Sequence, residues 1–100
     1  MEIRFRTKKL EKQYRNHKEA IRVYGEQVAK RYIMRINIIK QAKCFDDLYA
    51  IPTLKLHPLV GKRKGEYAIA LTGFYRLIIT KDGETFNIVC IEEVSKHYGD

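Results

Sequence analysis

The 100-residue sequence contains no tryptophan, two prolines and only two cysteines. Cys44 and Cys90 form no Cys-x-x-Cys motif, and no second group of metal-ligand residues accompanies them. Such a pair indicates neither a disulfide framework nor a zinc site. We therefore expect both cysteines to be buried as small apolar side chains, and we expect no metal and no cofactor.

Long apolar segments are also missing. Nowhere do about 18 apolar residues run together, as a membrane-spanning helix requires. The first residues, Met1 to Arg6, lack the apolar core of a signal peptide. The basic residues are dispersed along the chain, which argues against a lysine-rich helix that binds a membrane surface. We expect a soluble, cytoplasmic protein with no membrane partner.

Acidic residues are few relative to basic ones: 12 Asp and Glu stand against 20 Lys and Arg, for a net charge of +8. This excess favours a polyanionic partner, and nucleic acid is the natural candidate, because each neutralised phosphate releases bound counterions. With 45% hydrophobic residues, the chain can form one modest core but not two ordinary ones. We expect a single domain over residues 1–100.

The N-terminal half begins with alternation and continues with helical spacing. Residues 2–5 alternate polar and apolar side chains, which predicts a short strand. Thr7 can cap a short basic helix that buries Leu10 and Tyr14.

After a polar turn at residues 16–20, the spacing predicts a second helix from about Ala20 to Lys43. Its buried stripe comprises Val28, Tyr32, Ile36 and Ile39. Its basic residues are expected away from the core, most simply as a solvated face; they are Lys30, Arg31, Arg35 and Lys40.

The C-terminal half changes to period two after an irregular stretch. A turn of helix is expected near residues 45–50, and Ile51 to Gly65 contains both prolines and is interpreted as the functional loop. Three alternating runs follow, at residues 67–71, 75–80 and 86–94, separated by Thr72-Gly73 and by an Asp-Gly turn. They predict a three-stranded antiparallel meander that the N-terminal strand can join, covered by two helices: an α+β fold.

One segment carries a family resemblance. The run Leu56-His57-Pro58-Leu59-Val60-Gly61-Lys62-Arg63-Lys64-Gly65-Glu66-Tyr67, followed by Gly73-x-x-Arg76, resembles the signature of the HigB, or plasmid-maintenance killer, branch of the RelE/ParE superfamily. The ending, Ile91 to Gly99, also resembles tails of that branch. The sequence departs from the family at Val60, where a basic residue is common, and at Glu93-Val94-Ser95, where many members read Asp-Tyr-His.

The resemblance implies both a fold and an activity. The fold would be RelE-like, with two N-terminal helices packed on a small antiparallel sheet. The activity would be that of a type II toxin–antitoxin toxin, which enters the ribosomal A site and cuts the exposed messenger RNA. A helix-turn-helix antitoxin, similar to HigA, would neutralise it.

Cleavage of RNA without a metal needs a base that activates the 2′-hydroxyl, an acid for the departing 5′-oxygen, and cations for the phosphorane charge. Histidine is the usual residue for proton transfer at neutral pH, so His57 and His97 are the candidates for this chemistry, and Tyr98 can donate a proton or stack on a base. The cations are expected to be Arg63 and Arg76, with three lysines that hold the strand: Lys55, Lys62 and Lys64.

Several alternatives stay open at this point. His57 can instead shape its loop through a backbone hydrogen bond. Either Glu92 or Glu93 can pair with Arg76, or both can face solvent. At the level of function, the alternatives are a ParE-like poison of DNA gyrase and a basic RNA-binding module without catalysis. The basic loop and His57 argue against the gyrase poison.

Overall fold

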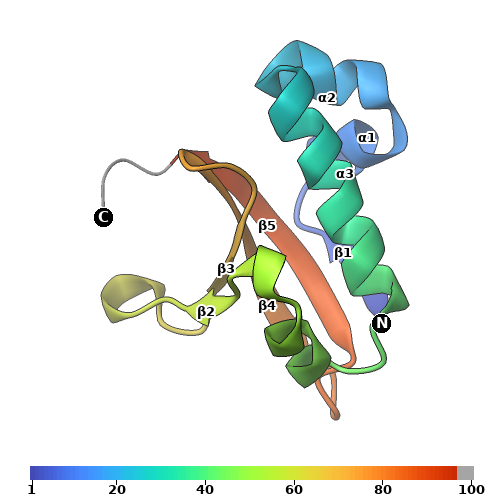
Figure 1. The fold of residues 1–100 in the computed structure, drawn as a ribbon. Coiled ribbons are helices and arrows are strands. Elements are labelled where there is room, and N and C mark those ends of the chain that lie inside the picture. The colour runs from blue at the N-terminus through green and yellow to red at the C-terminus, as the bar shows by residue number, and fades with distance from the viewer. Residues whose placement is uncertain (97–100) are drawn as a thin grey trace.

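A five-stranded sheet with helices on one face forms the fold, which the computed structural model describes for residues 1–96. In chain order the elements are β1 (Glu2–Phe5), α1 (Lys8–Arg15), α2 (His17–Tyr24), α3 (Glu26–Gln41), the 3-10 turns η1 (Phe45–Ala50) and η2 (Pro52–Leu54), β2 (His57–Pro58), the 3-10 turn η3 (Gly61–Arg63), β3 (Tyr67–Ala70), β4 (Tyr75–Asp82) and β5 (Ile88–Lys96). The three α-helices lie together on one side of the molecule, and β2 lies at the opposite edge (Figure 1). The α+β fold class is confirmed.

The sheet has the strand order β1-β5-β4-β3-β2. Strands β3, β4 and β5 form the antiparallel meander that the alternating runs predicted. Strand β1 does join the meander, but it pairs with β5 in parallel, with Ile3 opposite Val89 and Phe5 opposite Ile91. The sheet is therefore mixed and not wholly antiparallel, because alternation determines which side chains face the core and not the direction of the strand.

A fifth strand lies where the sequence suggested only irregular structure. His57 pairs with Ala68 and Pro58 pairs with Tyr67, and the Leu59 amide donates to the Glu66 carbonyl at 2.9 Å. The pairing is only two residues long and contains a proline, which an edge strand tolerates because one side of it needs no donor.

The long second helix predicted from Ala20 to Lys43 is in fact two helices, and the turn predicted at residues 16–20 is wrong. Helix α2 begins at His17, and the Asn16 side chain caps it by accepting from the Lys18 amide. Gly25, at φ +83° and ψ 166°, then separates α2 from α3. Only glycine adopts this backbone shape readily, so the chain changes direction there although the apolar spacing continues.

The predicted core stripe of α3 is confirmed: Val28, Tyr32, Ile36 and Ile39 are all buried. They pack against alternate residues of the sheet, which are Ile69, Leu77, Ile79, Val89 and Ile91. The Tyr32 hydroxyl donates to the Leu10 carbonyl at 2.8 Å, so the buried phenol has a partner. The predicted cap of α1 is present too, since the Thr7 hydroxyl oxygen accepts from the Leu10 amide.

A bulge in β5 changes which side chains meet the helices. Ile78 is opposite Glu93 but Ile79 is opposite Ile91, so Glu92 is the extra residue. Because of this shift, Val94 and Ile91 both contact the apolar cluster, which strict alternation would not allow. Glu93 is turned to the other face.

The other departures are local. Strand β5 begins at Ile88 and not at Phe86, because the connection after Gly83 is longer than a two-residue turn.

Cys44 is exposed and Cys90 is half-buried, so the expectation that both are buried is wrong. Burial raises the pKa of Cys90 to about 11, and Glu92 contributes to the rise. Within residues 1–96 we find no helix long and apolar enough to cross a membrane.

We predict that Gly25→Ala lowers the free energy of unfolding by about 1–3 kcal/mol, measured by urea denaturation, because a Cβ strains the positive-φ backbone. Nothing lies within 4 Å of the added Cβ, so the loss would come from the backbone and not from a clash. Gly73→Ala is the matched control, since its Cβ also meets open space and no positive φ strains it. An equal loss in both variants would contradict this explanation.

Candidate functional site

A cleft of about 420 Å³ lies between β2 and the loop that joins β3 to β4. We call it the β2 cleft. It is lined by three of the residues predicted from the sequence: Lys55 and His57 from the segment around β2, and Arg76 from β4. Ala68 and Ala70 of β3 are the register partners of His57 and Arg76, and both also line the cleft. Their small side chains leave the space between the imidazole and the guanidinium open.

Arg76 has no charge partner among residues 1–96. Its Nε is buried and makes no hydrogen bond. A buried donor without an acceptor costs about 1–3 kcal/mol, and more when it belongs to a charged group. The guanidinium thus brings an uncompensated charge to a cleft that has no acidic lining residue, and this arrangement favours an anion there.

Neither Glu92 nor Glu93 pairs with Arg76, and neither simply faces solvent, because each has another partner. Glu93 bonds to Arg63, and Glu92 accepts from the Thr80 hydroxyl at 2.7 Å. Neither carboxylate therefore neutralises Arg76.

His57 is exposed, and its Nδ1 lies 2.9 Å from the Lys55 carbonyl oxygen. A carbonyl only accepts, so this contact favours the tautomer in which Nδ1 carries the proton. Nε2 is then left with a free lone pair that can take a proton. The loop-shaping role and a role as base are thus compatible. Lys55 itself has a left-handed backbone, with φ 49°, which helps direct its carbonyl at the ring.

Arg63 does not line the β2 cleft. Its Nε donates to Glu66 at 2.5 Å, and its second guanidinium nitrogen bonds to Glu93. The hydrogen bonds that the guanidinium donates to the two carboxylates, that to Glu66 first, raise its pKa. This arginine ties the η3 loop to β5, and its charge is already compensated.

The remaining predicted residues lie elsewhere. Lys62 is exposed, and Lys64 lines an adjacent hollow of about 450 Å³ beside Val60 and Tyr67. His97 and Tyr98 lie outside the described residues. The structure therefore brings together Lys55, His57 and Arg76, but not the other basic residues of the loop motif.

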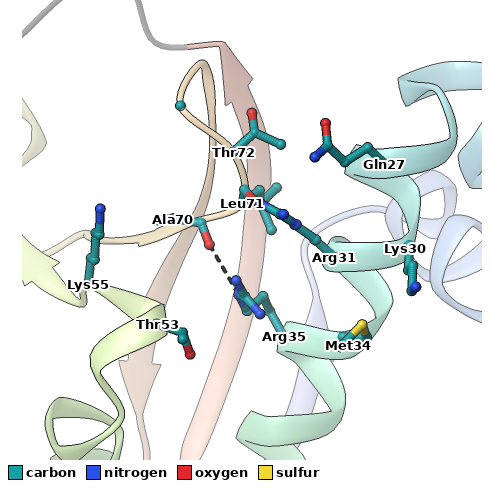
Figure 2. Close-up of a pocket in the computed structure, with 11 residues that line it drawn as sticks. Gln27, Lys30, Arg31, Met34, Arg35, Thr53, Lys55, Ala70, Leu71 and Thr72 are labelled. Carbon is teal, nitrogen blue, oxygen red and sulfur yellow. Dashed lines mark hydrogen bonds between the residues drawn. The ribbon is translucent and has the colours of Figure 1, made fainter.

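A larger cleft of about 720 Å³ adjoins the first, between α3 and the β3–β4 loop (Figure 2). We call it the α3 cleft. The sequence suggested a solvated face here, but Arg31 and Arg35 are half-buried and bond to the sheet. Arg31 donates to the Leu71 carbonyl at 2.8 Å, and Arg35 donates to the Ala70 carbonyl at 3.2 Å. The sequence did contain an indication that these arginines are not simply solvated: after Glu26, helix α3 has no acidic residue that could pair with its basic ones.

Burial lowers the pKa of Arg35, and the neighbouring charge of Arg31 lowers it further. Two guanidinium groups on successive turns of one helix repel each other, and no carboxylate lies among the residues that line this cleft. As for metals, no group of three His, Cys, Asp or Glu side chains is placed to hold an ion in the part of the chain that the structure describes.

Comparison with known proteins gives one family and one fold. Residues 3–91 match the model of a family described as the RelE-like toxin of the type II toxin–antitoxin system HigB. No curated protein sequence matches this chain.

Three solved structures are similar. The YoeB/ParE toxin from Agrobacterium tumefaciens has 17% identity and a TM-score of 0.59, covering 98% of this chain and 100% of that one. The YoeB-YefM complex from Staphylococcus aureus has 17% identity and a TM-score of 0.63, covering 98% of each chain. YafQ from E. coli strain BL21(DE3) has 14% identity and a TM-score of 0.60, covering 98% of each chain. At these identities the likeness shows a shared fold.

We predict that Arg63→Ala lowers the free energy of unfolding by about 1 kcal/mol, because it leaves the carboxylates of Glu66 and Glu93 unpaired on a partly exposed surface. Urea denaturation measures the change. The control is Lys62→Ala, which removes a neighbouring exposed charge and should change stability little. If Lys62→Ala lowers the free energy of unfolding as much as Arg63→Ala does, the ion pairs of Arg63 do not stabilise the η3 loop.

Proposed function

The chain belongs to the HigB-like family of RelE-like toxins of type II toxin–antitoxin systems, and we propose that it acts by cutting messenger RNA on the translating ribosome. The observation that carries this proposal is the buried, unpartnered Nε of Arg76 in a cleft that also contains His57 and Lys55. Three positively charged or titratable side chains around a hollow without a carboxylate suit a phosphodiester.

The proposed reaction uses the 2′-hydroxyl of the RNA as the nucleophile. Nε2 of His57 takes the hydroxyl proton, and the oxygen attacks the adjacent phosphorus. Arg76 donates to the oxygens on which negative charge builds up, and Lys55 adds a second cation. The 5′-oxygen departs with a proton, which leaves a 2′,3′-cyclic phosphate and a 5′-hydroxyl end. His97 and Tyr98 remain the candidates for the acid that supplies this proton.

The shape of the site supports a single-stranded substrate. The β2 cleft has a volume of about 420 Å³, which suits a splayed nucleotide and not a duplex. Messenger RNA in the ribosomal A site is held as an extended single strand, so the ribosome would position the scissile phosphate in the cleft. For Arg63 we propose a positioning role, in which its ion pairs with Glu66 and Glu93 hold the η3 loop beside the cleft.

The family also implies an antitoxin, and we propose a helix-turn-helix protein similar to HigA. The net charge of +8 suits a partner with a complementary acidic surface, since such charges speed association and help to select the partner.

We predict that Arg76→Ala reduces cutting by about 100-fold or more, the size of effect seen when one donor to a developing oxyanion is removed. A defined message is translated in vitro with purified protein, and cuts are mapped by primer extension with and without ribosomes. His57→Ala should reduce cutting as well. Arg15→Ala, which removes an exposed arginine of α1, should leave it unchanged.

The outcomes separate the three functions. Cuts that need ribosomes and disappear in Arg76→Ala support the nuclease. An intact message together with inhibited supercoiling by DNA gyrase would replace it with the gyrase poison. Salt-sensitive RNA binding without any cut would indicate a module that binds RNA and has no catalytic activity.

A further inference from the structure

Four basic side chains line the α3 cleft: Lys30, Arg31, Arg35 and Lys55. The proposed reaction involves Lys55 but not the other three. None of the residues that line this cleft is acidic. By contrast, Arg4, Arg15, Arg22 and Arg63 each form an ion pair with a glutamate. Like Arg6 and Arg76, the two arginines of α3 have no carboxylate partner within residues 1–96.

The sheet holds both guanidinium groups in place. Arg31 donates one N–H to the carbonyl of Leu71, directly after β3. Arg35 donates one N–H to the carbonyl of Ala70, the last residue of β3 (Figure 2). The other N–H groups make no hydrogen bond to any described residue. The two guanidinium groups are half-buried, held in place and left with N–H groups that have no acceptor. Together they can donate hydrogen bonds to the oxygens of one phosphate.

The two clefts share part of their lining. Lys55, Ala70, Thr72 and Gly73 line both of them. A strand whose reacting phosphate lies beside Arg76 can therefore continue past Lys55 into the α3 cleft without leaving the surface. Gln27 and Thr53 lie in the same cleft and offer neutral partners for ribose hydroxyls.

We propose that Arg31 and Arg35 form a second phosphate-binding subsite, which holds a flanking phosphate of the RNA strand whose scissile phosphate lies at Arg76. This inference rests on the proposed function, because the occupant is the same RNA. The lining shared with the β2 cleft favours RNA over an acidic protein segment, since the strand whose phosphate reacts at Arg76 can reach both clefts. The subsite would retain a longer strand and leave the chemical step to Arg76 and His57.

The test is the dependence of binding on RNA length. Single-stranded oligonucleotides with 2′-O-methyl groups cannot be cut by attack of the 2′-oxygen, so binding can be measured by fluorescence anisotropy without cleavage. The wild type should bind a hexanucleotide more tightly than a dinucleotide. In Arg31→Gln/Arg35→Gln, binding of the hexanucleotide should weaken about tenfold, and the slope of its salt dependence should fall by about 0.7 for each phosphate that the variant no longer neutralises. Binding of the dinucleotide should not change.

Arg15→Gln/Arg22→Gln is the matched control, because it removes the same net charge from helices α1 and α2 outside both clefts. A second variant protects the test against misfolding. Thr53→Glu leaves both arginine–carbonyl bonds in place and adds a competing carboxylate at an exposed position that lines the cleft. It should also abolish the gain in affinity with length, whereas Gln41→Glu, at an exposed position of α3 outside both clefts, should not.

Retention of wild-type hexanucleotide affinity in Thr53→Glu, or in a folded Arg31→Gln/Arg35→Gln protein, would overturn the subsite. So would a loss of affinity for an octa-glutamate peptide with RNA binding intact, which would assign the cleft to an acidic protein segment. The proposed function is judged separately by ribosome-dependent cutting with the wild type. A wild type that cuts, with variants that cut and bind equally well, would leave the nuclease standing and remove only the subsite.

Discussion

The bulge at Glu92 determines which side chains of β5 pack under the helices and which lie on the opposite face of the sheet. It allows Ile91 and Val94 to pack under the helices although they are three residues apart on one strand. It also turns Glu93 to the opposite face, where this carboxylate bonds to Arg63. As a result, the glutamate that stands diagonally across the sheet from Arg76 is already occupied, and Arg76 keeps an uncompensated charge.

The same pattern governs the rest of the molecule. Glutamates neutralise arginines on α1, on α2 and in η3, but they are absent from the lining of the two adjoining clefts. These clefts thus carry positive charge that no lining carboxylate compensates, which the net charge of +8 alone does not reveal. Because no carboxylate lines the two clefts, an anion can bind there without first displacing an internal ion pair.

Much of this could be predicted from the sequence, because alternation and helical spacing report directly on burial. The strands of the meander, the cap at Thr7 and the stripe on α3 followed from local sequence patterns. The grouping of His57 with Arg76 came instead from the family resemblance. The break at Gly25, the parallel pairing of β1 and the pairing of Arg63 with Glu93 followed from neither. Each depends on backbone geometry or on an interaction between distant residues, to which local periodicity is insensitive.

The proposed nucleophile is the 2′-hydroxyl of the RNA itself, activated in a cleft built from residues of the chain. The most direct test replaces this hydroxyl by hydrogen at one mapped cutting position of a message programmed into ribosomes. We expect cutting to stop at that position and to continue at unmodified ones, with cyclic phosphate ends. Continued cutting at the deoxy position would contradict the proposed mechanism, because the attacking oxygen would then have to come from water or from the protein.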